Sequence, residues 1–324
     1  MTDMTYRPLG RCGTKVSSFG LGGWTTFGGS ITSDDATRAI LHRAFERGVN
    51  FFDIADVYAR GASETIMGKA LAELPRRHLV ISSKVFFPMS DDVNDRGLSR
   101  KHIFESVHDS LRRIGTDYLD IYFCHRFDDE TPLDETVHAM DDLVRQGKVL
   151  YWGTSVWSGD QLRDAHSIAA AGGCYAPQVE QPQYSLVVRE AVERDVQPAC
   201  ESLGMGLVVW SPLGSGVLTG KYDDGIPEDS RLAQIDWLRE RVLQEQQAFE
   251  RVRAMKAVAD AKGCSRAQLA LAWAAAQPGI SSVILGATSV AQLDENLDAL
   301  DVEIDAETAQ RLDQLFPGAP PVEA

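Results

Sequence analysis

Positive charge is scarce in this chain of 324 residues. Lysine and arginine total 32 against 47 aspartate and glutamate, so the net charge is 32 − 47 = −15. A surface this acidic repels phosphate backbones and anionic lipids, which argues against nucleic acid or a membrane surface as a partner. The sequence also lacks an apolar run of the roughly 20 residues that span a bilayer, and its start lacks a signal-peptide pattern. We therefore expect a cytoplasmic protein without membrane insertion.

Cysteine is equally sparse, and patterns of metal ligands are missing. The 5 cysteines include no Cys-x-x-Cys pair, which indicates free thiols in a reducing compartment. The 7 histidines form no H-E-x-x-H or other compact ligand set, so we expect no metal site. Two glycine-rich stretches also fail as motifs: the one at 20–25 lacks the last glycine of a dinucleotide fingerprint, and the one at 214–222 has the wrong spacing for a P-loop.

The chain does contain a regular alternation of two kinds of segment. Short apolar runs rich in β-branched and aromatic residues alternate with longer amphipathic stretches that carry helix start and stop signals. Serines 33, 63, 99 and 158 and Pro132 mark helix starts, and further helices are expected over 189–203, 237–262, 265–277 and 289–300. The runs predict eight strands, at 19–21, 50–53, 79–82, 118–124, 149–154, 178–181, 207–210 and 282–285.

Strict alternation of strands and helices predicts a parallel sheet, because a helix must return the chain to the same end of each strand. Eight such units predict an α/β fold of the (β/α)8 TIM-barrel type. Two short apolar segments at 6–9 and 15–17 predict a β-hairpin that plugs the opposite end of the barrel, and extra C-terminal helices follow the long segment after Trp210. We expect one domain over 1–324, with 317–324 as a flexible tail.

Four ionisable residues lie where the predicted strands end, which is where barrel enzymes carry their chemistry. They are Asp53, Tyr58, Lys84 and His125. Singly, each has an ordinary explanation as a helix cap, a packing residue, a solvated charge or a buried hydrogen-bonding group. Four together on one rim, two of them directly after apolar runs, would be costly to bury without a function.

Together, these four groups predict a site that donates a proton to a carbonyl. A tyrosine titrates near 10 and needs a neighbouring cation to stabilise its phenolate, which Lys84 can supply, with Asp53 as the counter-ion. His125 can donate a hydrogen bond to the substrate carbonyl beside Tyr58. The set contains neither a nucleophile nor a metal, so the electrons must come from a hydride cofactor.

These residues in their context resemble the catalytic tetrad of the aldo-keto reductases. The surrounding motifs agree: GLGGW at 20–24, NFFDIADVY at 50–58, GTS at 153–155, WSPL at 210–213 and LGAT at 285–288. The chain is most similar to the branch of the potassium-channel β-subunits, through TFGG at 26–29, RGLSRK at 96–101 and GKY at 220–222. The resemblance implies an NADP(H)-dependent reductase of aldehydes or reactive ketones, of the alcohol dehydrogenase or aldehyde reductase type. It also implies a possible homo-oligomer, a tetramer or an octamer.

The resemblance also implies which residues bind the cofactor and the substrate. Trp210 would stack on the nicotinamide, Ser155 and Gln181 would hold its carboxamide, and Lys221 and Arg231 would be cations for its phosphates. The implied cofactor residues are Gly23, Trp24, Asp53, Ser155, Gln181, Trp210, Ser211, Pro212, Leu213, Gly214, Ser215, Lys221, Arg231, Gly286, Thr288, Gln292, Glu295 and Asn296. The residues expected to line the substrate pocket are Trp24, Tyr58, Phe86, Phe87, His125, Trp157 and Tyr184.

Two departures from the family pattern are visible. Val156 stands where the family commonly has asparagine, so a polar cofactor contact is missing, and His125 stands where the channel β-subunits carry asparagine. An NADP(H)-binding regulatory or redox-sensing subunit of a protein complex is the main alternative, and a metal-dependent hydrolase using Asp53 and His125 is another. Arg126 either steers an anionic substrate or forms a surface salt bridge, and Phe86 and Phe87 either line the pocket or pack in a loop.

Overall fold

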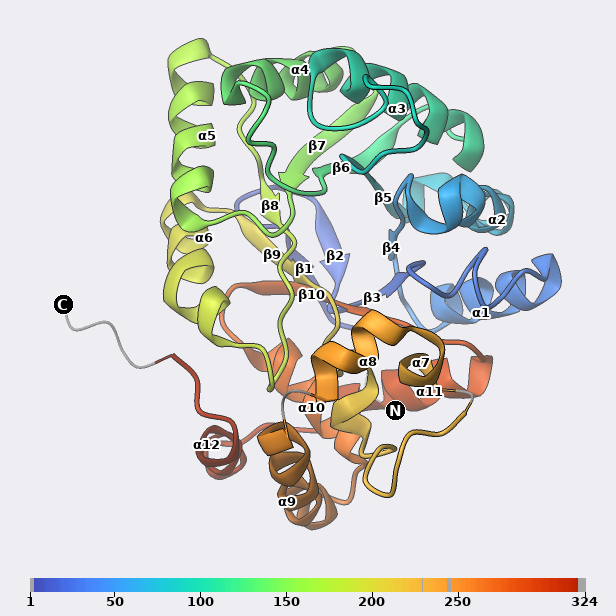
Figure 1. Cartoon of the computed structure of the whole chain (residues 1–324), viewed down its shortest axis with the longest axis vertical. Coiled ribbons are helices and arrows are strands. Elements are labelled where there is room, and N and C mark those ends of the chain that lie inside the picture. The colour runs from blue at the N-terminus through green and yellow to red at the C-terminus, as the bar shows by residue number, and fades with distance from the viewer. Residues whose placement is uncertain (1–2, 229, 244–245, 320–324) are drawn as a thin grey trace.

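Eight parallel strands close into a barrel surrounded by helices (Figure 1). The structure is a computed structural model that describes residues 3–228, 230–243 and 246–319, without the side chains of 231, 241–243 and 246. The strand order around the barrel is β10-β3-β4-β5-β6-β7-β8-β9, which confirms the predicted (β/α)8 architecture. These strands are β3 (Phe19–Gly22), β4 (Phe51–Asp53), β5 (Val80–Val85), β6 (Leu119–Cys124), β7 (Val149–Thr154), β8 (Val179–Glu180), β9 (Gly206–Val209) and β10 (Ile280–Leu285).

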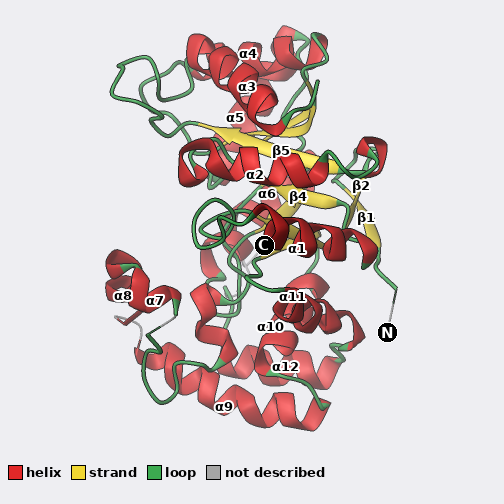
Figure 2. Ribbon diagram, turned by 90° about the vertical axis from the view of Figure 1, so that its right-hand side faces the viewer, coloured by secondary structure: helices red, strands yellow, loops and turns green. Residues whose placement is uncertain are grey.

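The helices cover the outside of the barrel and extend it at one end. Figure 2 shows α9 and α12 together below the barrel, with α7 and α8 beside them at one edge of the molecule. Within the described residues, no helix has both the length and the apolar character that crossing a membrane requires. The helices are α1 (Asp34–Glu46), α2 (Ala62–Leu71), α3 (Arg100–Ile114), α4 (Leu133–Arg145), α5 (Gly159–Gly172), α6 (Gln197–Leu203), α7 (Arg231–Gln234), α8 (Asp236–Leu243), α9 (Gln246–Lys262), α10 (Arg266–Ala276), α11 (Val290–Leu297) and α12 (Ala306–Leu315).

The predicted N-terminal hairpin is present and packs against the interior of the barrel. Its strands are β1 (Tyr6–Pro8) and β2 (Lys15–Ser17), and Leu9 and Val16 are fully buried in one cluster with inward side chains of the barrel strands. Gly10 lies so close to the start of β9 that a Cβ there would be 2.4 Å from the carbonyl oxygen of Gly204. Only glycine fits this approach, so the plug is fixed at the end of the barrel opposite the predicted site.

Several predicted helix ends are confirmed, and one is wrong. Ser33, Ser99 and Ser158 each accept a hydrogen bond from a first-turn backbone N–H, as N-cap residues do. Ser63 does not cap its helix, because α2 already begins at Ala62 and Ser63 is buried inside it. Gly61 takes the cap position instead, with a φ of +85° that a glycine adopts without strain.

Two other predicted helices differ from single continuous α-helices in the described residues. The stretch 189–203 contains a π-helical turn, Val192–Val196, before α6, where Pro198 lacks the N–H of a regular first turn. The stretch 289–300 ends in a 3-10 turn after α11. The predicted helix 237–262 is helical on both sides of 244–245, as α8 and α9, and 244–245 lie outside the described residues. Of the predicted tail, Ala319 donates a backbone hydrogen bond to Glu193 (3.0 Å), and 320–324 lie outside the description.

Candidate active site

Three adjacent strands bring the four predicted catalytic residues to the carboxyl end of the barrel. Asp53 is the last residue of β4, Lys84 is the penultimate residue of β5, and His125 directly follows β6. Tyr58 begins a 3-10 turn, Tyr58–Gly61, in the loop after β4. The hydrogen-bond ladder between β5 and β6 continues past the end of β6, because the backbone N–H of His125 donates to the carbonyl of Val85 (2.9 Å).

Lys84 is the centre of the hydrogen-bonded group. Its Nζ donates to Asp53 Oδ2 (2.7 Å), to the backbone carbonyl of Ile54 (2.6 Å) and to the Tyr58 hydroxyl (3.1 Å). The three donors of an ammonium group are thus all used, although the Lys84 side chain is fully buried. A buried ion pair with complete hydrogen bonding is stable where either charge alone would be costly.

The second carboxylate oxygen of Asp53 also accepts hydrogen bonds. Its Oδ1 accepts hydrogen bonds from the Ser82 hydroxyl (2.7 Å) and from Gln181 Nε2 (2.9 Å). Both carboxylate oxygens therefore have protein donors, and among the described residues no group of three or more His, Cys, Asp or Glu side chains is arranged to hold a metal ion. This geometry disfavours the hydrolase alternative, in which Asp53 would be a metal ligand.

The charges around Tyr58 and Lys84 set the protonation state of the site. Burial raises the pKa of Tyr58 and outweighs the lowering effect of Lys84, so the net direction is upward. Lys84 acts on Tyr58 in the expected direction, since its charge and hydrogen bond both lower the pKa of the phenol. Burial alone would lower the pKa of Lys84. The charges and hydrogen bonds of Asp53 and Tyr58 outweigh this effect, so the pKa of Lys84 is raised. At neutral pH the pair is therefore a protonated phenol beside an ammonium ion.

His125 completes the group as a neutral ring. Burial, with the charges of Lys84 and Arg126, holds its pKa well below the ordinary value of 6.5. Its ring packs edge-to-face on Tyr58 at 5.8 Å and on Phe87 at 5.0 Å between centroids. The Nδ1 atom is buried without a hydrogen-bond partner in the described structure. A neutral imidazole of this kind suits donation of a hydrogen bond to a carbonyl oxygen rather than proton transfer.

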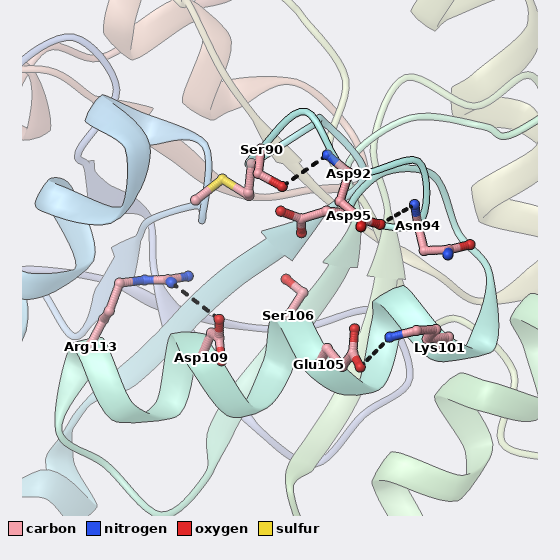
Figure 3. A pocket seen from close by; sticks show the side chains of 10 residues that line it. Ser90, Asp92, Asn94, Asp95, Lys101, Glu105, Ser106, Asp109 and Arg113 are labelled. Carbon is pink, nitrogen blue, oxygen red and sulfur yellow. Dashed lines mark hydrogen bonds and ion pairs between the residues drawn. The ribbon is translucent and has the colours of Figure 1, made fainter.

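A hollow of about 490 Å³ opens elsewhere, between α3 and the loop after β5 (Figure 3). Its charged residues are largely paired with one another: Arg113 lies 3.9 Å from Asp109, and Lys101 pairs with Glu105. None of the four catalytic candidates lines it. We therefore keep the candidate site at the strand ends.

Comparison with known proteins identifies the family. The model of the "Aldo/keto reductase family" matches residues 18–316. The chain belongs to the aldo/keto reductase family. It is 46% identical over 304 residues to a protein of Arabidopsis thaliana named "Probable voltage-gated potassium channel subunit beta", with 92% of each chain covered. A Schizosaccharomyces pombe protein named "Putative voltage-gated potassium channel subunit beta" is 41% identical over 322 residues, covering 97% of this chain and 94% of its own.

These findings confirm the resemblance to the channel β-subunit branch and make the chain one of a family of oxidoreductases. Members of this aldo/keto reductase family generally bind NADP(H). In this structure, the residues expected to bind it, apart from Asp53 on β4, follow five consecutive strands, β7, β8, β9, β10 and β3. The catalytic candidates occupy the other three strands. The two sets therefore form neighbouring arcs of one rim, with Asp53 belonging to both.

Backbone hydrogen bonds and one ring contact fix several of the expected cofactor residues at the strand ends of this aldo/keto reductase. The backbone N–H groups of Ser155 and Gln181 continue the ladder by donating to Cys124 (2.9 Å) and Thr154 (2.8 Å). Trp24 and Trp210 meet edge-to-face with their ring centroids 6.4 Å apart. Ser155, Gln181 and Trp210 thus directly follow β7, β8 and β9, and Trp24 lies just after the end of β3, where the cofactor is expected.

The glycine-rich segment after β9 forms the next part of the arc. Gly214–Thr219 is a 3-10 turn in which Ser215 and Gly216 have positive φ, and Lys221 Nζ lies over the ring of Tyr222 at 5.1 Å. Across the arc, Gln292 Oε1 accepts from both the N–H and the hydroxyl of Thr288, at 2.8 and 3.0 Å. The side chain of Arg231 lies outside the described part of the chain, so its expected phosphate contact stays a prediction.

Two residues expected in the substrate pocket are placed elsewhere. Tyr184 is buried, packs on Trp273 with centroids 5.3 Å apart and donates its hydroxyl to Glu193 (2.7 Å). Trp157 is also buried, against Phe127. Neither ring has exposed surface for a substrate in this conformation, so we remove both from the expected pocket. Phe87 stays in it through its contact with His125.

Sequence reasoning missed the turn after β7 and the carboxylate that supports it. Glu180 is fully buried and accepts hydrogen bonds from the Thr154 hydroxyl, from the N–H of Trp157 (3.3 Å) and from the N–H of Val156. Burial raises its pKa to about 7. Val156 in this turn has a φ of +60°, which is rare for a β-branched residue. The available signal was an acidic residue directly before Gln181 in an apolar strand.

A second missed group lies behind Tyr58. Asp56 is buried and accepts hydrogen bonds from the N–H of Val57 (2.6 Å) and from the Ser106 hydroxyl (2.9 Å). Burial, with the nearby charge of Glu64, raises the pKa of Asp56 to about 7. Asp56 thus ties the segment that carries Tyr58 to helix α3.

Proposed function

We propose that the protein is an NADPH-dependent oxidoreductase that reduces aldehydes, or reactive ketones, to alcohols. The observation that carries the proposal is the hydrogen bond from a fully buried, Asp53-paired Lys84 to the Tyr58 hydroxyl at 3.1 Å. NADPH would supply a hydride to the carbonyl carbon. The balanced reaction converts R–CHO, NADPH and a proton into R–CH2OH and NADP⁺, so one two-electron oxidation matches one two-electron reduction.

The protein's own residues would manage the proton. Tyr58 donates its hydroxyl proton to the carbonyl oxygen, and Lys84 stabilises the phenolate that remains. His125, being neutral, donates a hydrogen bond that holds the carbonyl oxygen beside Tyr58. The phenolate is then reprotonated from solvent, and Asp53 keeps Lys84 charged throughout.

The expected cofactor residues would hold NADP(H) along the arc from β7 to β3. Ser155 and Gln181 provide polar groups for the carboxamide, Trp210 provides a ring face, and the N-terminus of α11 lies beside Thr288 and Gln292 for a phosphate. Lys221 is a cation in the loop after β9. In an acidic protein, cations at this position suit the phosphates of a dinucleotide.

The test follows NADPH absorbance with purified protein and a panel of small aldehydes. Tyr58→Phe should lower the turnover by about 10²–10⁴-fold, the usual contribution of a positioned proton donor, while NADPH still quenches the tryptophan fluorescence. Tyr175→Phe, at an exposed tyrosine on the loop before β8, is the matched control and should keep full activity. Absence of turnover with every aldehyde, despite bound NADPH, would refute the proposal.

A second candidate is a regulatory or redox-sensing subunit that binds NADP(H) within a protein complex. The names of the relatives as channel β-subunits favour it. The complete set of Asp53, Tyr58, Lys84 and His125 favours the enzyme instead. A stable stoichiometric complex in pull-down experiments, together with negligible turnover, would favour the subunit.

A further inference from the structure

Arg126 is a partly buried cation at the mouth of the candidate site. It follows His125 directly, and its guanidinium lies over the ring of Phe87, 5.4 Å from the centroid. Phe87 in turn packs on His125. The charge of Arg126 acts on both Tyr58 and His125, whose pKa values it lowers alongside Lys84. Arg126 is therefore within electrostatic reach of the atoms expected to hold the carbonyl.

The structure argues against one of the two roles left open by the sequence. Arg126 forms no ion pair with a carboxylate in residues 3–228, 230–243 and 246–319; its hydrogen bond goes to the backbone carbonyl of His125. By contrast, surface arginines such as Arg163 pair with a neighbouring carboxylate. Glu180 acts on Arg126 only at longer range and is itself occupied by Thr154 and the turn after β7. A surface salt bridge thus does not account for Arg126.

We propose that Arg126 is a specificity-determining residue that binds an anionic group of the substrate, so that the preferred substrates are short aldehydes carrying a carboxylate or a phosphate. A planar guanidinium binds either oxyanion through paired hydrogen bonds. Burial lowers the pKa of Arg126 by removing water from the guanidinium, so an oxyanion bound there would replace lost hydration of the charge. This inference rests on the proposed carbonyl reduction and names its substrate class.

The test compares substrates matched in length. Succinic semialdehyde carries a carboxylate, and methyl 4-oxobutanoate is its neutral ester; glyceraldehyde 3-phosphate and glyceraldehyde form the phosphate pair. The wild-type kcat/KM should favour at least one anionic aldehyde over its neutral partner by about tenfold or more, as expected for a charge-assisted contact. The pair that shows the preference identifies the oxyanion.

Arg126→Met should remove this preference, lowering kcat/KM for the anion by about tenfold or more while that for the neutral partner changes less than about twofold. Arg126→Lys, which keeps the charge, should retain part of the preference. Arg163→Met is the control, because it removes one exposed positive charge on α5 away from the site and should leave both rates unchanged.

The outcomes separate the two proposals. Reduction of neutral aldehydes without an anion preference would overturn the role of Arg126 and leave the carbonyl reductase intact. An equal loss for both members of a pair in Arg126→Met would show that Arg126 only supports His125, and would also overturn it. Absence of turnover with any aldehyde would overturn both proposals.

Discussion

Val156 is the position where one substitution should make the protein more stable. Its backbone has a φ of +60°, and its side chain is 46% exposed. The left-handed conformation costs an L-residue about 1–2 kcal/mol, and branching at Cβ makes valine one of the least suitable residues for it. Asparagine adopts the same conformation at lower cost because its short polar side chain can hydrogen-bond locally.

The size of the gain follows from the exposure of the side chain. Burying a whole valine contributes roughly 1.5–3 kcal/mol, so a half-exposed valine contributes about half of that, and asparagine of similar size retains part of it. Against a strain of about 1–2 kcal/mol, Val156→Asn should raise the free energy of unfolding by about 0.5–1 kcal/mol. In a chain this long, this corresponds to an increase in Tm of about 1–3 °C.

The assay is thermal and urea unfolding of the variant beside a matched control. Val93 is 79% exposed and does not have a positive φ, so Val93→Asn changes the same chemical groups without relieving strain. Its stability should stay within about 0.5 kcal/mol of the wild type. If Val156→Asn is no more stable than Val93→Asn, the argument from backbone strain is refuted.

Three further outcomes test the electrostatics. Lys84→Met leaves the Asp53 carboxylate buried without its cation and should destabilise the protein by about 3–5 kcal/mol in urea unfolding; an unchanged midpoint would contradict the buried ion pair. The kcat/KM for a neutral aldehyde should show no inflection near pH 6.5, because the pKa of His125 lies well below that value and that of Tyr58 above 10; an inflection near 6.5 would show that His125 titrates normally. Folding raises the pKa of Glu180 from 4.5 to about 7, so its contribution to stability is complete below pH 4.5 and is lost as the pH rises through 7. The stability of Glu180→Gln relative to the wild type should therefore improve by about 2–3 kcal/mol from pH 5 to pH 8, and a constant difference would contradict this.

The strand ends could be predicted because the sequence changes character there. Asp53 and His125 each follow an apolar run directly, and an ionisable residue in that place is visible without coordinates. The strand that carries Lys84 proved longer than predicted, since β5 runs on to Val85. The serine, lysine and valine that extend this strand are residue types found in both strands and loops. The backbone pairing of Lys84 with Phe123 on β6 is what makes this segment part of the strand.

Other features depend on contacts that the local sequence does not contain. Ser63 has the side chain of a helix cap, but the left-handed Gly61 starts the helix before it. The carbonyl of Ile54 that accepts from Lys84 is a backbone group with no signature in sequence. Likewise, the turn with the positive φ of Val156 donates backbone hydrogen bonds to Glu180, which lies on the next strand of the barrel and is 24 residues further along the chain.

The division of the rim into two arcs has a consequence for engineering. The proton-transfer groups come from β4, β5 and β6, while the expected cofactor residues other than Asp53 come from the other five strands. Gln181 joins the two arcs by its 2.9 Å hydrogen bond to Asp53. Under the proposed function, libraries in the loops after β9 and β10 should alter the choice between NADPH and NADH without changing the four catalytic candidates. Loops after β5 and β6 can be diversified separately for new carbonyl compounds, so long as Gln181 is kept constant in both.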